Sequence, residues 1–198
     1  MKIRIALALS AVMLITIATN VAEARATNEK KRGKIDAIAK DALSVVLDNR
    51  ERAKDLFNKS YGYAVFDNVK ISLMISGGGG RGVAVERASG NRTYMNMGTI
   101  GLNIGLGAQK YQVIFFFEDK ATFEDFVNKG WQADANANAV AGTKGANAEA
   151  AAGSAGANAE AAFDGGGMAL YQITEAGLML QADIAGTKFW KNKKLNKK

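Results

Sequence analysis

Side chains in the middle of the chain alternate with a period of two residues. Tyr61, Tyr63 and Val65 alternate with their neighbours, and the same period recurs over residues 71–76. This period is typical of β-strands, because successive side chains of a strand point to opposite faces of a sheet. Residues 83–95 predict a hairpin with a Gly/Asn turn over 88–91. Residues 112–117 are apolar at every position from Val113 onward, which predicts a central strand covered on both faces.

The pattern before this region is helical. Between Ile35 and Leu47, apolar residues recur at spacings of three and four, so they form one stripe along a helix. A break is expected at Asp48-Asn49, and a second helical piece over 51–59. The first helix begins with a cluster of cations, and such a helix either lies on an anionic membrane surface or covers the sheet with a solvated basic end. The cluster comprises Lys30, Lys31, Arg32, Lys34 and Lys40.

A capped helix is predicted directly after the central strand. Asp119 is a suitable N-cap, the residues from Ala121 to Val127 are amphipathic, and Gly130 follows as a stop. The adjacent carboxylates Glu118 and Asp119 raise the alternative of acid–base catalysis. Neighbours in sequence point apart, and capping accounts for the acidic residues, so we expect no catalytic role.

The glycine run at 77–82 formally satisfies the G-x-G-x-x-G pattern through Gly77, Gly79 and Gly82. Dinucleotide binding requires a helix after such a run, whereas the predicted hairpin follows here. The run is therefore interpreted as a strand junction or bulge where backbone approaches backbone. A second interpretation is that Arg81 and the free amides of a loop at this position bind a phosphate group.

Residues 132–162 are rich in alanine, and the heptapeptide GANAEAA occurs in them twice. Alanine alternates with other residues from Ala133 to Ala141, which favours short antiparallel strands with one alanine face. The alternative is a disordered, low-complexity insert. If strands form, the alanine face allows either close packing of layers or a narrow apolar slot for an acyl chain, and close packing is expected.

The chain returns to ordinary strands near its end. Residues 168–174 and 178–184 predict a hairpin with a turn over 175–177. The basic residues that follow surround Phe189 and Trp190, an arrangement typical of a peripheral membrane contact, in which aromatic rings insert at headgroup level. The alternative is a frayed, solubilising terminus with both aromatic rings in the core. The basic residues are Lys188, Lys191, Lys193, Lys194, Lys197 and Lys198.

The N-terminus has the pattern of a secretory signal peptide. Lys2 and Arg4 precede a short apolar run over 5–17, and small residues at 22–26 supply a cleavage pattern. The alternative is an uncleaved amphipathic anchor. A cleaved signal predicts a periplasmic or secreted protein.

Composition limits the chemistry that the chain supports. The chain has 198 residues, 48% of them apolar, which suits a single domain. Cysteine and histidine are absent, so thiolate and imidazole metal ligands and the usual general base are missing. No nucleophile–base pair or metal cluster is recognisable, and we expect no enzyme activity, no metal site and no cofactor. The formal charge of +7 favours anionic partners.

Four separated segments, in the same order along the chain, resemble the SYLF domain. They are SYGYAVF from Ser60, the glycine run before GVAV, TIGLNIGLGAQ, and the strand-to-helix junction FFFEDKATFEDF. The SYLF domain is a lipid-binding module of bacterial exported proteins and of eukaryotic membrane-trafficking and actin-patch proteins. The resemblance spans Arg32 to Trp190. In eukaryotic SYLF domains an N-terminal amphipathic segment takes part in phosphoinositide binding, which supports a membrane role for the first basic cluster.

Together these observations predict an α+β fold, with N-terminal helices packed on a twisted, mainly antiparallel sheet that curls towards a barrel or orthogonal sandwich. The expected boundaries are a signal peptide at 1–24, one domain at 25–190 and a basic tail at 191–198. The expected function, which rests mainly on the resemblance, is non-catalytic binding of anionic phospholipid by a peripherally membrane-associated protein. The expected lipid-binding residues are Lys30, Lys31, Arg32, Lys34, Arg81, Lys188, Trp190, Lys191, Lys193 and Lys194.

The alternative function is a structural or protein-interaction domain of the cell envelope. Nucleic acid and actin are not expected as partners, because neither shares the predicted compartment. The headgroup and the oligomeric state are left open by the sequence.

Overall fold

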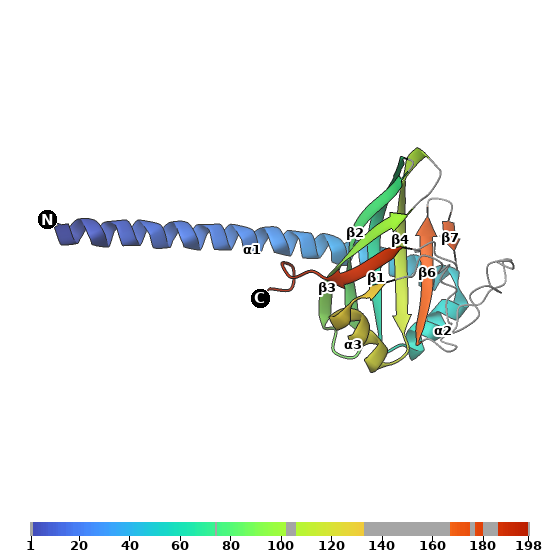
Figure 1. Ribbon diagram of the computed structural model, residues 1–198. Helices are drawn as coiled ribbons and strands as arrows, with labels where there is room; N and C mark the ends of the chain where they lie inside the picture. Colours follow the sequence, from blue (N-terminus) through green and yellow to red (C-terminus); the bar gives the residue numbers. More distant parts are fainter. Residues whose placement is uncertain are drawn as a thin grey trace. The chain divides into compact units, whose positions relative to one another are not determined.

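A computed structural model describes residues 2–73, 75–101, 106–132, 167–174, 177–179 and 186–197. Two compact units divide the chain, Met1–Lys34 and Ile35–Lys198. Among the described residues, no helix is both long enough and apolar enough to cross a membrane. The elements in chain order are α1 (Lys2–Asn49), α2 (Glu51–Lys59), β1 (Gly62–Leu73), β2 (Ile75–Glu86), β3 (Arg92–Gly101), β4 (Leu106–Phe117), α3 (Lys120–Lys129), β5 (Trp131–Gln132), β6 (Met168–Thr174), β7 (Gly177–Met179) and β8 (Thr187–Lys191) (Figure 1).

The described strands of the second unit form one antiparallel sheet in the order β5-β8-β3-β2-β1-β4-β6-β7. The predicted α+β class with a curled sheet is confirmed. The break between α1 and α2 falls at Arg50, next to the expected Asp48-Asn49. The predicted strand over residues 112–117 belongs to the longer strand β4, which pairs with β1 and β6. Strands β6 and β7 pair antiparallel, which confirms the predicted hairpin over its described residues, 168–174 and 177–179.

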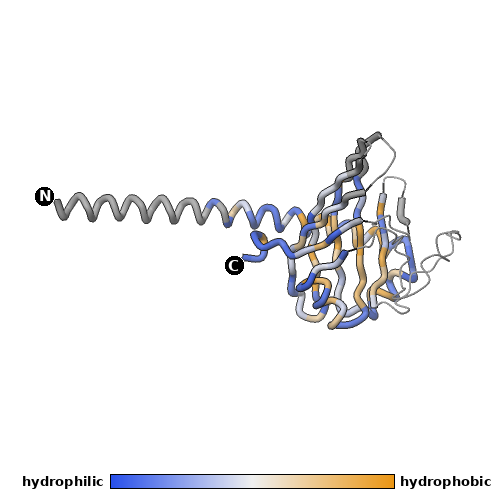
Figure 2. The backbone as a smooth tube through the Cα atoms, in the orientation of Figure 1, coloured by the Kyte–Doolittle hydropathy of each residue, from blue (hydrophilic) through white to orange (hydrophobic). Residues whose placement is uncertain are grey.

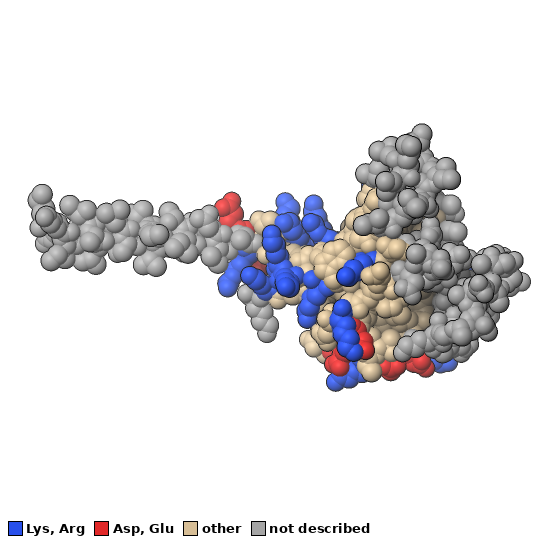
Figure 3. Space-filling view, in the orientation of Figure 1, with Lys and Arg blue, Asp and Glu red and all other residues tan. Residues whose placement is uncertain are grey.

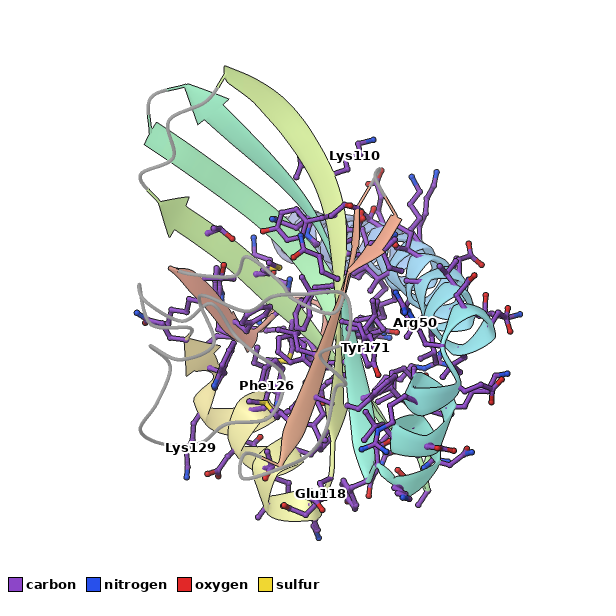
Figure 4. The ribbon with its side chains drawn as sticks, turned by 90° about the vertical axis from the view of Figure 1, so that its right-hand side faces the viewer. Arg50, Lys110, Glu118, Phe126, Lys129 and Tyr171 are labelled. Atoms are coloured by element: carbon purple, nitrogen blue, oxygen red, sulfur yellow. The ribbon has the colours of Figure 1, made fainter. Side chains whose placement is uncertain are left out.

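Each face of the sheet buries its own set of side chains. The first face, here called the α3 face, packs Phe66, Phe115 and Phe117 against Phe126 of α3 and Phe189 of β8. The opposite face, here called the α1 face, buries side chains of β1, β2, β4 and β6 beneath α2 and the part of α1 after Lys34. Figure 4 shows α3 with Phe126 on one side of the sheet and Arg50 on the other. Figure 2 shows hydrophobic positions concentrated in the central strands.

Strand β2 overturns the expectation of a junction or bulge at the glycine run. Gly77 to Gly82 lie inside β2, and β1 pairs with it one to one from Gly62↔Glu86 to Leu73↔Ile75. The chain therefore reverses between Leu73 and Ile75, so the predicted strand over 71–76 is divided between two strands. A two-residue period continues through a tight hairpin, and for that reason the pattern alone did not locate the reversal.

Close approach of backbone to backbone, the other half of that interpretation, is present. A Cβ atom built on Gly82 would lie 2.2 Å from the Val65 carbonyl oxygen, and one built on Gly80 would lie 2.2 Å from the Asp67 carbonyl oxygen. Gly79, between them, has open space on the α1 face. Glycine is thus required where the sheet curls inward on the α3 face.

The helix after the central strand forms as predicted. Asp119 Oδ1 accepts a hydrogen bond from the Thr122 amide at 2.8 Å, and Gly130 ends α3 with a φ of 78°. The predictions for the alanine-rich segment concern residues that lie outside the described part, apart from Gln132 in β5.

Candidate functional site

The residues after β8 are folded onto the sheet, so the alternative of a frayed terminus is wrong. Leu195 is 3% exposed and belongs to the core of the α1 face. The Asn192 amide donates to the Tyr94 carbonyl at 2.9 Å, which continues the pairing of β3 with β8. The Asn192 side chain accepts hydrogen bonds from the amides of Lys194 and Leu195, which closes a turn over 193–196.

Asn196 completes this attachment. Its Oδ1 accepts a hydrogen bond from the Tyr94 amide at 3.0 Å, and its Nδ2 donates to the Tyr94 carbonyl at 2.7 Å. A carboxamide that both accepts from and donates to one residue's main chain acts like the peptide group of a neighbouring strand. We call residues 192–196 the C-terminal clip. The clip holds Lys193 and Lys194 on an ordered surface.

The two aromatic residues of β8 have different environments. Phe189 is fully buried on the α3 face, where its ring centroid lies 4.7 Å from that of Phe66. Trp190 is 41% exposed and lies on the α1 face, opposite Asn96 of β3. The alternative that places both rings in the core is therefore correct for Phe189 and wrong for Trp190.

The strand register brings Trp190 onto the same face as two of the predicted cations. Trp190 pairs with Asn96, and Asn96 pairs with Arg81 of β2. Lys188 pairs with Gly98 in the adjacent row. Directly paired residues of antiparallel strands point to the same side of a sheet, so these side chains share the α1 face.

The same two rows contain residues that sequence reasoning did not single out. Lys188, Gly98, Gly79, Val69 and Lys110 follow one another across β8, β3, β2, β1 and β4. Val69 is 38% exposed, and Lys110 is exposed. In Figure 4, Lys110 lies on the same side of the sheet as Arg50. In the sequence, Lys110 and Gln112 alternate with the apolar residues Tyr111 and Val113. This alternation could have predicted that Lys110 and Gln112 lie on the same face of a strand. The basic sheet face is defined here as Val69, Arg81, Lys110, Lys188 and Trp190.

The cations of this region have no acidic partners within the described part of the chain. Arg81, Lys110 and Lys188 are exposed, and none of them forms an ion pair there. Within the same described part, this also holds for Lys193 and Lys194 of the clip and for Lys191 next to it. Asp67, opposite Arg81, is a nearby acid. In Figure 3, basic side chains lie along the described part of α1 and near the segment that follows β8, and both basic and acidic side chains lie over α3.

The glycine run does not form a loop with free amides, so its interpretation as a phosphate-binding loop is wrong. Strand β2 pairs with both β1 and β3 over residues 76–85, so its amides are committed to the sheet. Arg81 as a lipid contact through its side chain stays a prediction.

The remaining predicted site residues belong to the other compact unit. Lys30, Lys31 and Lys34 are exposed on α1, and Arg32 is half-buried. Lys30 and Lys34 share one side of the helix through their spacing of four residues. The structure therefore divides the predicted site into two groups, one on each unit.

A second polar cluster, at the turn between β2 and β3, has a structural role. The Tyr61 hydroxyl donates to Glu86, and this hydrogen bond is the main reason that the pKa of Tyr61 rises to about 12. Hydrogen bonds, first from Ser89 and then from Tyr61, lower the pKa of Glu86. Arg87 donates to the carbonyl oxygens of Asn58 and Ser60. The SYGY segment thus ties the hairpin to the end of α2.

The described residues contain no group of three acidic side chains that could hold a metal ion. What this part of the sheet surface offers is exposed positive charge, the exposed indole ring of Trp190 and the exposed aliphatic side chain of Val69. Such groups bind through electrostatic attraction and burial of apolar surface.

Comparison with known proteins identifies relatives of this chain. A family model described as "Las17-binding protein actin regulator" (Ysc84) matches residues 98–198. The chain is also 43% identical over 169 residues to "Beta cell expansion factor A" of Aeromonas veronii. That alignment covers 85% of this chain and 60% of the relative, so the chain spans less than two thirds of the length of that protein.

Proposed function

The chain belongs to the Ysc84 (SYLF) family, and we propose that it is a non-catalytic domain that binds anionic phospholipid at a membrane surface. Membership of this family makes it a binding domain in the general sense, for lipid or for protein. The finer assignment to anionic phospholipid, in an exported protein, is our proposal.

The observation that carries the proposal is a set of cations close to Trp190 that form no ion pair within the described part of the chain. Lys188 shares the face of Trp190. Lys191 follows this ring at the end of β8, on the opposite face, and the clip holds Lys193 and Lys194 close by in sequence. An exposed indole suits the headgroup region of a bilayer, and cations near an anionic leaflet are attracted by about 1 kcal/mol each. Charge and ring occur together on an ordered segment, which supports a surface contact over a solubilising tail.

The proposal is tested by co-sedimentation with vesicles. We expect binding to phosphatidylcholine vesicles that contain phosphatidylserine, little binding to phosphatidylcholine alone, and loss of binding in high salt, because screening weakens attraction between exposed charges. The combined substitutions Lys191→Gln, Lys193→Gln and Lys194→Gln should weaken binding and leave thermal stability nearly unchanged, since these side chains are exposed.

The second candidate function is a protein-interaction domain, which is favoured by the description of the matching family as a protein-binding regulator. Sedimentation that is indifferent to both lipid charge and salt would reject lipid binding and leave this candidate. Reproducible turnover of a metabolite by the purified protein would reject both.

A further inference from the structure

The basic sheet face joins residues from five strands into one surface. From Lys188 on β8 to Lys110 on β4 the row crosses four strand-to-strand steps, about 19 Å at the usual spacing of strands. Arg81 and Trp190 lie in the row beside it. These residues are separated by up to about 120 positions in the sequence, and only the register of the sheet places them together.

The centre of this face has no side chains of its own. Gly79 and Gly98 are paired with each other between Lys188 and Val69, so no side chains rise from the middle of the row. The ring of Trp190 extends across Gly98, where a built Cβ atom would lie 3.0 Å from Cη2. Trp190 is therefore supported by the sheet beneath it, and a partner can approach the bare backbone beside it closely.

Charge and apolar exposure together indicate the kind of partner. Arg81, Lys110 and Lys188 outnumber the one half-buried acid in these rows, Asp67. Trp190 and Val69 are two of the three large hydrophobic side chains that are exposed in the described part of the chain, and they lie in adjacent rows of this face. A surface that combines exposed cations with exposed apolar side chains is complementary to an anionic bilayer, which offers phosphates above an apolar layer.

We propose that the basic sheet face is the surface that lies against the bilayer, with Trp190 inserted at headgroup level and Arg81, Lys110 and Lys188 contacting lipid phosphates. This inference rests on the proposed function, because it assigns the orientation in which lipid is bound. It adds Val69 and Lys110 to the contact.

The fluorescence of Trp190 reports on this orientation directly. The chain has two tryptophans, and Trp131 packs against Phe115 and Phe189 on the α3 face, so Trp131→Phe leaves Trp190 as the single reporter. We expect its emission to shift to shorter wavelength with vesicles that contain phosphatidylserine, and to be quenched by brominated phosphatidylcholine in the same vesicles. Vesicles of phosphatidylcholine alone should produce neither change.

Charge substitutions test the rest of the face. Arg81→Gln, Lys110→Gln and Lys188→Gln together should weaken partition to the anionic vesicles on the order of 100-fold, about fivefold for each cation. The control is Lys120→Gln with Lys129→Gln, which removes charge from α3 on the opposite face and should change partition much less for each cation removed. Val69→Ser should weaken partition without a change in charge. Circular dichroism and thermal melts confirm that each variant is folded.

The outcomes separate this inference from the proposed function. Vesicle binding with an unshifted Trp190 spectrum, or with equal losses for each cation removed in the two charge variants, would overturn the orientation and leave lipid binding intact. Absence of any binding to anionic vesicles would overturn both. Tight binding to an acidic polymer such as heparin, with no spectral shift on vesicles, would assign the face to a polyanionic macromolecule instead.

Discussion

The glycines of β2 allow a sharp test of how tightly the sheet curls. Gly82 and Gly79 lie in the same strand, and each is paired on both sides. A methyl group at Gly82 would meet the Val65 carbonyl oxygen at 2.2 Å and the Phe66 ring at 2.5 Å, whereas a methyl group at Gly79 has nothing within 4 Å. Gly82→Ala and Gly79→Ala are therefore the same chemical change in opposite environments.

The magnitudes follow from these contacts. Replacing glycine by alanine in a strand gains roughly 0.5–1 kcal/mol, because the unfolded chain loses conformational freedom. Gly79→Ala should therefore be neutral or stabilising by up to about 1 kcal/mol. At Gly82 the closest atom is backbone, which cannot rotate away, so a strain of about 1–3 kcal/mol or more opposes that gain. For a chain of this length, each kcal/mol of lost stability lowers Tm by about 2–4 °C.

Urea unfolding followed by circular dichroism measures both variants against the parent protein. We expect Gly82→Ala to unfold at lower urea and Gly79→Ala at the same or higher urea. Gly80→Ala, with its Cβ 2.2 Å from the Asp67 carbonyl oxygen, should behave like Gly82→Ala. Equal stability of all three variants would refute the close approach of β1 and β2 on the α3 face.

Two further predictions concern the ties that hold the unit together. The raised pKa of Tyr61, about 12 against an ordinary 10.0, means that its contribution to stability is complete below pH 10 and is lost as the pH rises through about 12. The destabilisation caused by Tyr61→Phe, measured by urea unfolding, should therefore shrink between these pH values, and a constant difference would contradict it. Leu195→Ala should cost about 2–5 kcal/mol, as for other buried leucines, whereas Lys194→Ala next to it should cost little. Equal effects in thermal melts would show that the clip is not packed on the core.

Local patterns predicted those parts of the fold that local forces determine. The helical stripe after Ile35, the N-cap at Asp119 and the apolar run from Val113 each depend on neighbours within a few residues, and each appears in the structure where expected. The reversal between Leu73 and Ile75 was missed because both strands of a hairpin keep the same period. The glycine run was interpreted as a strand junction or bulge, whereas it lies inside β2 and its role depends on close contacts with β1.

The candidate site was only partly predictable for a related reason. Exposed lysines near Trp190 are visible in the sequence, but the side of β8 on which this ring lies is fixed by its pairing with β3. That Arg81 and Lys110 share the face depends on three further strand pairings between distant segments. The two sets of substitutions therefore test different predictions. Substitution of Lys191, Lys193 and Lys194 tests a contact predicted from the sequence. Substitution of Arg81, Lys110 and Lys188 tests a contact inferred from the strand register.

The clip also bears on how a nascent chain reaches this fold. Tyr94 and Asn196, which it joins, are 102 residues apart, and β3 obtains its neighbour β8 only from residues 187–191. Until residues 187–196 have left the ribosome, one edge of β3 has no partner strand and Leu195 has not reached its place in the core of the α1 face. An unpaired edge of this kind invites pairing with other chains, so this unit is vulnerable to aggregation until these residues are free to pair.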